Sequence, residues 1–371
     1  MSEPIPSSAP AQGAPAPVPP AARKSSWKYT LGLIAVLVAG AGGYYLYVRA
    51  QNPEPPPVDE LTELKAYLTR LAANQKLADG YADTDPKDLV ADTPKDPSKW
   101  AKVDGELVFT VVGTDDPAKA VEEWKDFMAA LGKATGKKVK YLDGIQTIED
   151  QLTAVREGRL HVTAFNTGAV PMAVNTAGFV PLFAPADAQG KFSYEMEILV
   201  RADSPVKTPA DLKGKTVGFV ALSSNSGAKA PMVTLKDEFG LLPGRDYKYA
   251  IIGEHIRSVK ELVAGRCDAA CVANDLLHRA EASGELDKTK YRSLYVSKPF
   301  PPLCFGVPHH LPPELRGKVA RAFAEFQFAG TSVGKRYVPQ GKTKFAAVSY
   351  EKDWEYVRKI DDTLSHLLDG R

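Results

Sequence analysis

Short apolar runs alternate with longer amphipathic segments through most of the chain beyond residue 105. Short strands are expected at 107–112, 137–142 and 160–165, of which the first is an apolar run with several β-branched residues. The segments at 118–135 and 145–156 instead place apolar residues at helical spacing. Strands that alternate with helices over short connections predict an α/β fold with a doubly wound, parallel sheet.

The same pattern begins again near residue 197. The strands expected there, with helices between them, are 194–200, 216–220, 247–251, 269–273 and 291–296. A strand at 304–307 and helices at 312–328 and 354–368 then return to the first unit. We therefore predict two doubly wound lobes joined by two crossing strands. Lobe 1 is expected to span 104–196 plus 306–371, and lobe 2 to span 197–305.

One strand of lobe 2 leads directly into small polar residues. Ser223, Ser224, Asn225, Ser226 and Gly227 separate this strand from an expected helix. The first turn of a helix has unpaired N–H groups and the positive end of the helix dipole, so it favours an anion. Taken alone, these residues leave open an ordinary N-cap without a ligand, because Ser and Asn are preferred caps.

Other polar residues follow predicted strands in the same way. They are Thr114 and Asp115, Asn166 and Thr167, His255, and Asp275. In doubly wound sheets, ligands bind outside the carboxyl ends of the strands. All six residues therefore join the polar stretch of lobe 2 as candidates for ligand binding. No metal ligand and no cofactor is predicted.

The N-terminus has a composition unlike the rest. Residues 1–28 are rich in Pro, Ala and Ser and are expected to be a disordered cytoplasmic tail. Residues 29–48 carry no charge, match the thickness of a bilayer and follow a basic cluster, so we expect a transmembrane anchor with the N-terminus inside. A cleaved signal peptide is the alternative. Either way, the bulk of the chain is predicted to be extracytoplasmic.

Residues 49–103 are predicted to be an extracytoplasmic linker. They contain a proline-rich spacer, a short amphipathic helix and an aspartate-rich loop at 79–96. Closely spaced aspartates are able to bind calcium. The loop lacks the turn glycine and terminal glutamate of an EF-hand, so a solvated acidic linker is favoured.

Overall composition excludes some classes of function. The 371 residues have a formal net charge of +2, which gives no indication of nucleic-acid binding. Three cysteines are too few for a disulfide framework. Cys267 and Cys271 are expected to pack as small apolar side chains, and a Cys271–Cys304 disulfide remains an alternative.

The order of several short motifs resembles a known family. In chain order the motifs are Val200-Arg-Ala-Asp-Ser, Asp211-Leu-Lys-Gly-Lys-Thr, Ser224-Asn-Ser-Gly, Gly253-Glu-His, Gly265-Arg-Cys-Asp-Ala-Ala and Leu311-Pro-Pro-Glu-Leu-Arg. Together they resemble the substrate-binding proteins of phosphate, phosphite and phosphonate ABC importers. The resemblance implies a type II periplasmic-binding-protein fold, in which two lobes close over a ligand.

The resemblance also implies roles for the candidate residues. Ser224, Asn225 and Ser226 take the positions of hydroxyls that meet the ligand's oxyanion, and Gly227 lets the backbone come close. His255 matches a family histidine that contacts the anionic head of the ligand. Asp275 matches a family acid that accepts from a protonated ligand oxygen or binds an amine.

The chain departs from the family pattern on the other side of the expected site. Ile148 and Val170 stand where the family has tyrosines, and Leu303 stands where it has an acid. Asn166 and Thr167 are expected to supply replacement donors. Because the part that holds the anion is kept and the part that reads the ligand's tail is changed, phosphonate, phosphite and phosphate all remain candidates.

We therefore expect a membrane-tethered solute-binding protein that captures a phosphorus oxyanion by hinge closure. Its expected partner is an ABC permease with a separate ATPase, because this chain has no Walker motif. The alternative is a ligand-sensing module that partners a signalling protein. An enzyme that uses Ser224, His255 and Asp275 as a triad is disfavoured, because the Gly-x-Ser-x-Gly elbow is missing.

Overall fold

The computed structural model describes residues 60–85, 87–111 and 117–367. They belong to one compact unit, Asp59–Arg371. The predicted tail at 1–28 and the predicted anchor at 29–48 lie outside the described residues. Within the described ranges, no helix is both long enough and apolar enough to cross a membrane.

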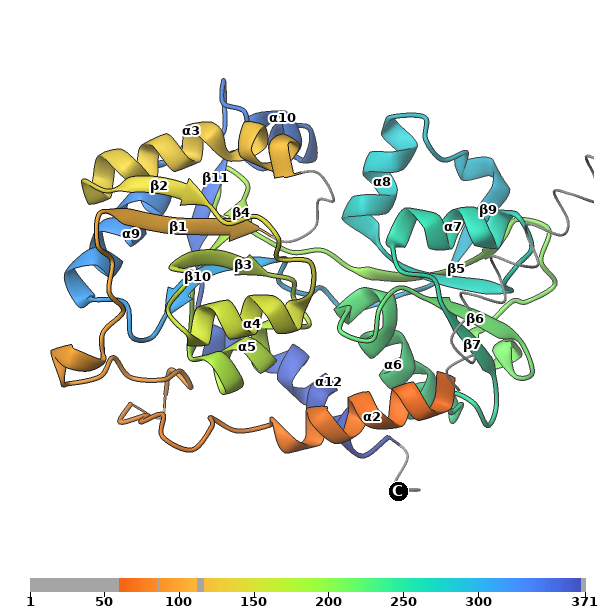
Figure 1. Cartoon of the computed structure of the whole chain (residues 1–371). Coiled ribbons are helices and arrows are strands. Elements are labelled where there is room, and N and C mark those ends of the chain that lie inside the picture. Colours follow the sequence, from red (N-terminus) through yellow and green to blue (C-terminus); the bar gives the residue numbers. More distant parts are fainter. Residues whose placement is uncertain (1–59, 86, 112–116, 368–371) are drawn as a thin grey trace, which may run out of the picture. The chain divides into compact units, whose positions relative to one another are not determined.

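The first sheet has the strand order β11-β4-β10-β3-β1-β2 (Figure 1). Its strands are β1 (Glu106–Val111), β2 (Lys138–Tyr141), β3 (Val162–Phe165), β4 (Phe179–Ala186), β10 (Cys304–Pro308) and β11 (Lys344–Ala347). β1 runs parallel to β2 and β3, whereas β10 runs antiparallel to β3 and β4. The prediction of an all-parallel sheet is therefore wrong: the returning strand β10 is antiparallel, because it enters the sheet without a helical crossover.

The second sheet has the order β7-β6-β8-β5-β9. Its strands are β5 (Met196–Arg201), β6 (Thr216–Phe219), β7 (Lys248–Ile251), β8 (Ala269–Ala273) and β9 (Tyr291–Val296). β6 is parallel to β7 and β8, and β5 is antiparallel to both of its neighbours. This sheet too is mixed, with the antiparallel strand arriving directly from the first sheet.

Two crossing segments join the sheets. The chain passes from β4 to β5 and returns from β9 to β10, and the segments pair with each other through backbone bonds between Tyr194 and Phe300. Their rings lie 5.9 Å apart, and Phe300 stacks on Tyr356 at 5.2 Å. The two connections therefore meet at one narrow junction beside the carboxyl ends of the strands.

Helices cover both faces of each sheet. In the first lobe they are α3 (Pro117–Thr135), α4 (Ile148–Arg156), α5 (Val170–Ala177), α9 (Pro313–Glu325), α10 (Gly334–Tyr337), α11 (Tyr350–Asp353) and α12 (Glu355–Ser365). In the second lobe they are α6 (Ala230–Phe239), α7 (His255–Val263) and α8 (Asn274–Ala282). α3 and α9 close an aromatic core around Phe109, Phe127 and Phe323. The buried cysteines are free, so no Cys271–Cys304 disulfide forms.

The segment expected to be a linker packs onto this body. Its helix α2 (Glu60–Ala73) buries Leu64, Leu68 and Leu71 in the same core as residues of α12 and α6. Farther along, the Asn175 side chain donates to the Asn74 carbonyl at 2.8 Å. In Figure 1, α2 runs beside α12 and α6. Its apolar spacing was visible in the sequence, and the structure shows what that face covers.

Candidate ligand-binding site

A cavity of about 450 Å³ lies where the carboxyl ends of the strands meet, with residues of both lobes in its walls. Eight of the residues proposed from the sequence line it: Asn166, Thr167, Ser223, Ser224, Asn225, Ser226, His255 and Asp275. Thr114 and Asp115 fall outside the described residues. Gly227 is not in the wall, and its place is explained below.

The stretch after β6 forms a π-helical turn, Asn225–Lys229, that continues into α6. Ser224 caps this turn: its Oγ accepts from the Gly227 N–H at 3.1 Å, and its carbonyl accepts from the N–H groups of Ala228 and Lys229. Across the described parts of the chain, the N–H groups of Asn225 and Ser226 have no acceptor. The cap and the anion site are therefore compatible, because capping uses one N–H group and leaves two.

The Asn225 side chain is buried next to a second lining residue, Tyr194. Its Nδ2 lies 3.4 Å from the Tyr194 hydroxyl, and its Oδ1 has no donor among the residues described. Oxygen and nitrogen of an amide are interchangeable in shape. In the flipped orientation Tyr194 donates to Oδ1, and Nδ2 takes the orphaned position. That position then needs an acceptor, which a ligand oxygen supplies.

Two glycines fix how closely the turn packs. A Cβ at Gly227 would lie 2.5 Å from the Val220 side chain, so this glycine lets the turn sit on the end of β6 and does not approach the cavity. A Cβ at Gly168 would lie 2.4 Å from the Ser223 carbonyl oxygen and 2.8 Å from the Asn225 nitrogen. The loop after β3 in the first lobe therefore rests directly against the turn of the second.

His255 is the first residue of α7, and one of its two ring nitrogens bonds to the protein. Its Nδ1 accepts from the Ala273 N–H at the end of β8, at 3.1 Å. Burial lowers the pKa of His255 to about 4, so the ring is neutral at pH 7. A neutral ring whose Nδ1 accepts must carry its proton on Nε2. His255 is therefore a neutral hydrogen-bond donor in the wall.

Asp275 opens α8 on the other side of the cavity. Its Oδ1 accepts from the Leu276 N–H at 2.9 Å, and burial raises the pKa of its carboxyl. Two lining arginines that sequence reasoning missed, Arg279 and Arg336, face the same space. Arg336 is held by Glu123 at 2.9 Å and packs over the Tyr337 ring. No motif marks these arginines, because they enter the wall only through the fold.

Asn166 and Thr167 are partly committed to the protein. The Asn166 Oδ1 accepts from the Ala169 N–H at 3.0 Å, which leaves its Nδ2 group. Thr167 donates to the Pro301 carbonyl at 2.8 Å and is buried, so it ties its loop to the crossing segment. Of the three apolar residues that depart from the family pattern, Ile148 and Leu303 line the cavity, whereas Val170 is buried and is not among its lining residues.

The site lacks the geometry of a nucleophilic triad. In the described coordinates, no hydrogen bond joins Ser224 to His255 or His255 to Asp275. The ring nitrogen that would contact the acid is occupied by a backbone N–H instead. The arrangement presents donors around an empty space, which suits binding of an anion.

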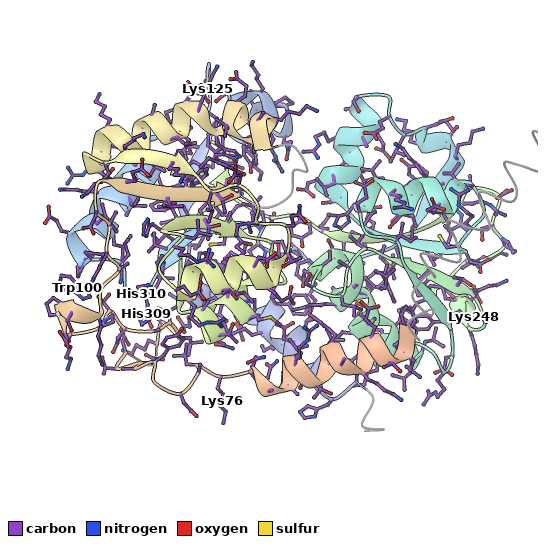
Figure 2. The ribbon with its side chains drawn as sticks, in the orientation of Figure 1. Lys76, Trp100, Lys125, Lys248, His309 and His310 are labelled. Atoms are coloured by element: carbon purple, nitrogen blue, oxygen red, sulfur yellow. The ribbon has the colours of Figure 1, made fainter. Side chains whose placement is uncertain are left out.

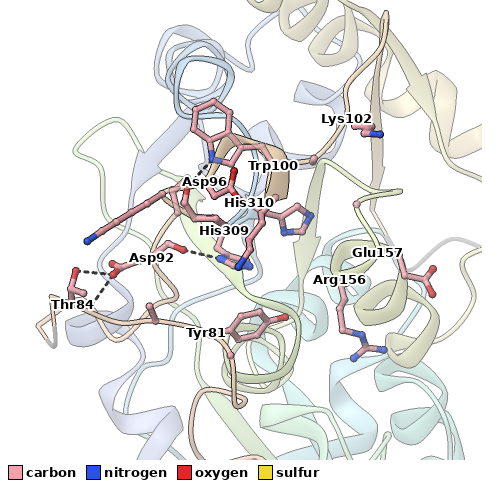
Figure 3. Close-up of a pocket in the computed structure, with 18 residues that line it drawn as sticks. Tyr81, Thr84, Asp92, Asp96, Trp100, Lys102, Arg156, Glu157, His309 and His310 are labelled. Atoms are coloured by element: carbon pink, nitrogen blue, oxygen red, sulfur yellow. Dashed lines mark hydrogen bonds between the residues drawn. The ribbon is translucent and has the colours of Figure 1, made fainter.

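A larger cavity, of about 920 Å³, lies elsewhere on the first lobe. Figure 2 shows three residues of its wall, Trp100, His309 and His310, close together on the first lobe. In the close-up of Figure 3, the Thr84 hydroxyl donates to the Asp92 carboxylate, and His309 Nδ1 lies 2.8 Å from the Asp92 carbonyl oxygen. Its residues precede β1 and β3 or follow the antiparallel β10. It therefore lies at the edge opposite to the carboxyl ends of the parallel strands.

The aspartates of the 79–96 loop serve mainly as turn caps. Asp85, Asp88 and Asp92 each accept from a backbone N–H within the loop, and Asp96 accepts from the Ser98 N–H just after it. Over the residues that the structure describes, no group of three or more His, Cys, Asp or Glu side chains is arranged to hold a metal ion.

The two-lobed fold and its polar cleft are typical of solute-binding proteins, and comparison with known proteins agrees with this class. A protein-family model described as "ABC transporter, phosphonate, periplasmic substrate-binding protein" matches residues 109–354, more than half of the chain. The chain belongs to this family, and its folded body is accordingly the periplasmic substrate-binding component of an ABC transporter.

Solved structures show the same fold at low sequence identity. A Xanthomonas citri protein bound to ATP is 15% identical, with 71% of this chain and 100% of that chain covered and a TM-score of 0.61. A binding protein of an ABC phosphonate transporter from Pseudomonas aeruginosa is 17% identical, with coverage of 70% and 88% and a TM-score of 0.58. PhnD1 from Prochlorococcus marinus, in complex with methylphosphonate, is 13% identical, with coverage of 70% and 98% and a TM-score of 0.58.

Proposed function

We propose that this protein captures a phosphorus oxyanion (phosphonate, phosphite or phosphate) between its lobes by hinge closure and delivers it to an ABC permease. The observation that carries the proposal is the set of unused donors in one cavity. The N–H groups of Asn225 and Ser226 and the Nε2–H of His255 have no protein acceptor in the described structure. A desolvated oxyanion requires several such donors.

The donors around the head are neutral. A neutral His255 and backbone N–H groups bind an anion without adding a counter-charge that must itself be buried. Such a site holds its donors ready over the whole range from pH 5 to pH 8. The expected hinge is the junction of the two crossing segments at Tyr194 and Phe300.

Three further charged residues of the wall, Arg279, Arg336 and Asp275, influence one another electrostatically. We assign them to the ligand's tail, with the arginines suited to a carboxylate and Asp275 to an ammonium or a protonated oxygen. With apolar Ile148 and Leu303 also in the wall, the cavity suits an organic tail better than bare phosphate. A phosphonate whose tail carries amino and carboxylate groups therefore fits more of the wall than methylphosphonate does.

The uncharged segment at 29–48 is proposed to tether the receptor to the membrane beside its permease. Protease treatment of spheroplasts tests this arrangement: a protected N-terminal tag with a degraded body supports it. A body released intact into the periplasmic fraction contradicts it.

Titration calorimetry tests the ligand class. The purified protein should bind at least one of phosphate, phosphite, methylphosphonate, 2-aminoethylphosphonate and 2-amino-3-phosphonopropionate with a dissociation constant of about 10 μM or below. A folded protein that binds none of the five would overturn the proposal.

A further inference from the structure

Lys229 is a completely buried lysine in the turn that begins the site helix. Its side chain is 0% exposed, yet its Nζ donates to the Gly168 carbonyl and to Asp361 Oδ1, each at 2.6 Å. The hydroxyl of Tyr67 lies near the same ammonium group and forms no hydrogen bond within the described residues. One side chain of the turn after β6 therefore bonds to the loop after β3 and to α12, and it lies beside α2.

The charge of Lys229 is retained in this apolar surrounding. Burial alone lowers its pKa, but attraction to Asp361 and Tyr67 outweighs burial, so the net pKa is raised. A buried ion pair is a weak source of stability compared with apolar packing, although breaking it is costly. Such a pair is best understood through what it positions.

What Lys229 reaches is the loop that carries Asn166 and Thr167. Gly168 of that loop already lies against Ser223 and Asn225, with no room for a Cβ. The Trp354 Nε1 donates to the Thr167 carbonyl at 3.1 Å from the same side as α12. The loop of the first lobe is thus held against the turn of the second from behind the cavity.

Two groups near the Lys229 ammonium lie outside the residues matched by the family model, 109–354. They belong to Tyr67 and Asp361, whereas Gly168 lies within the matched range. The α2 segment also contacts both lobes: the carbonyl of Asn74, just after α2, accepts from the Asn175 side chain of α5, and Leu61 packs at Gly244 of the second lobe. Figure 1 shows α2 passing along α12 and α6. The N-terminal helix is therefore placed to influence both halves of the site.

We propose that Lys229 is a positioning residue which, with Asp361 and with Tyr67 of α2, holds the loop 166–168 against the turn 223–227 beside the hinge, so that these two segments are already arranged when the rest of the cleft closes over the ligand. The inference rests on the proposed function of the same cavity. Loss of this network lowers the fraction of molecules that are competent to bind, and it weakens every ligand by the same factor.

The test compares two variants of the full-length protein. Lys229→Met/Asp361→Leu replaces the ion pair by apolar side chains of similar size, which keeps the core packed. Tyr67→Phe removes one hydroxyl. Calorimetry should show affinity about 10-fold weaker for the double variant and about 3-fold weaker for Tyr67→Phe, equally for every ligand that binds. The melting temperature of the double variant should stay close to that of the wild type.

The matched control is Val319→Ala, in the separate aromatic core of the first lobe. It should lower the melting temperature and leave affinity unchanged, which separates positioning from stability. Wild-type affinity in the double variant overturns the proposal, as does a loss confined to one ligand.

Hydrogen exchange of the unliganded protein keeps the test independent of the ligand. Amides at 166–170 and 223–229 should exchange at least several-fold faster in the double variant than in the wild type. Unchanged exchange at both segments overturns the positioning role. If the wild type binds no ligand but the exchange rates rise as expected, the proposed function fails while the positioning role stands.

Discussion

The larger cavity on the first lobe and the cleft between the lobes use their polar groups in opposite ways. In the larger cavity, of about 920 Å³, Asp92, Trp100 and His309 all hydrogen-bond to neighbouring parts of the chain. In the smaller one, of about 450 Å³, His255 and the turn after β6 keep donors that the protein does not use. Volume is therefore a poor guide here, and unsatisfied donors at the carboxyl ends of strands are a better one.

The largest expected effect comes from a charge placed in the cleft. Ser224→Asp keeps a preferred N-cap for the Gly227 N–H but sets a carboxylate beside the oxyanion. At about 4 Å such repulsion weakens affinity by at least about 100-fold. Calorimetry measures the loss, and thermal unfolding should show a melting temperature that is unchanged or slightly higher.

The matched control is Lys102→Glu in the wall of the larger cavity. Its change in charge is greater, and we expect a change in affinity of less than about two-fold because the site is distant and screened. Equal losses from the two substitutions would erase the distinction between the cavities.

A smaller effect is expected from His255→Asn. Asparagine retains an acceptor near the position of Nδ1 for the Ala273 N–H but withdraws the Nε2–H donor. Affinity should fall about 10-fold, as for one hydrogen bond to a charged group. Binding unchanged within two-fold would show that this ring does not contact the ligand.

The same residue predicts a pH dependence of stability. His255 has a folded pKa of about 4, below its unfolded value, so the unfolded chain takes up more protons between these values and stability is lost as the pH falls. From pH 7 to pH 5 the wild type should lose about 1–2 kcal/mol more than His255→Asn. Urea unfolding at both pH values measures the difference; equal losses would mean that the ring titrates normally in the fold.

Selectivity sharpens the comparison within the cleft itself. Arg336→Met removes a guanidinium from the tail end while the turn after β6 is untouched. Affinity for 2-amino-3-phosphonopropionate should fall about five-fold, and affinity for methylphosphonate should stay the same. An equal loss for both ligands would place Arg336 at the head and not at the tail.

The two-lobed α/β fold was predictable because each strand and helix has its own periodicity. Some elements were not. β4 contains Pro181 and Pro185 and was missed, since proline inside a strand argues against an interior position. The antiparallel direction of β5 and β10 was also missed, because alternation of strands and helices does not report how a strand arrives from another lobe.

The site residues also divide into those that the sequence predicts and those that only the fold reveals. The Ser224–Ser226 turn and His255 stand out because they follow strands in a recognisable order. Arg336 reaches the cavity from a short helix far along the chain. Lys229 reads as an ordinary exposed lysine in sequence, and only the fold reveals that it is buried against Asp361 and Gly168.

The location of the oxyanion is the central claim, and amide chemical shifts test it most directly. In a titration of ¹⁵N-labelled protein with a ligand that calorimetry has shown to bind, the largest shifts should occur at Asn225 and Ser226, with the His255 ring following. Tyr81, Trp100 and His310, in the larger cavity, should not move. The largest shifts at those three residues, with the turn after β6 unchanged, would contradict the account.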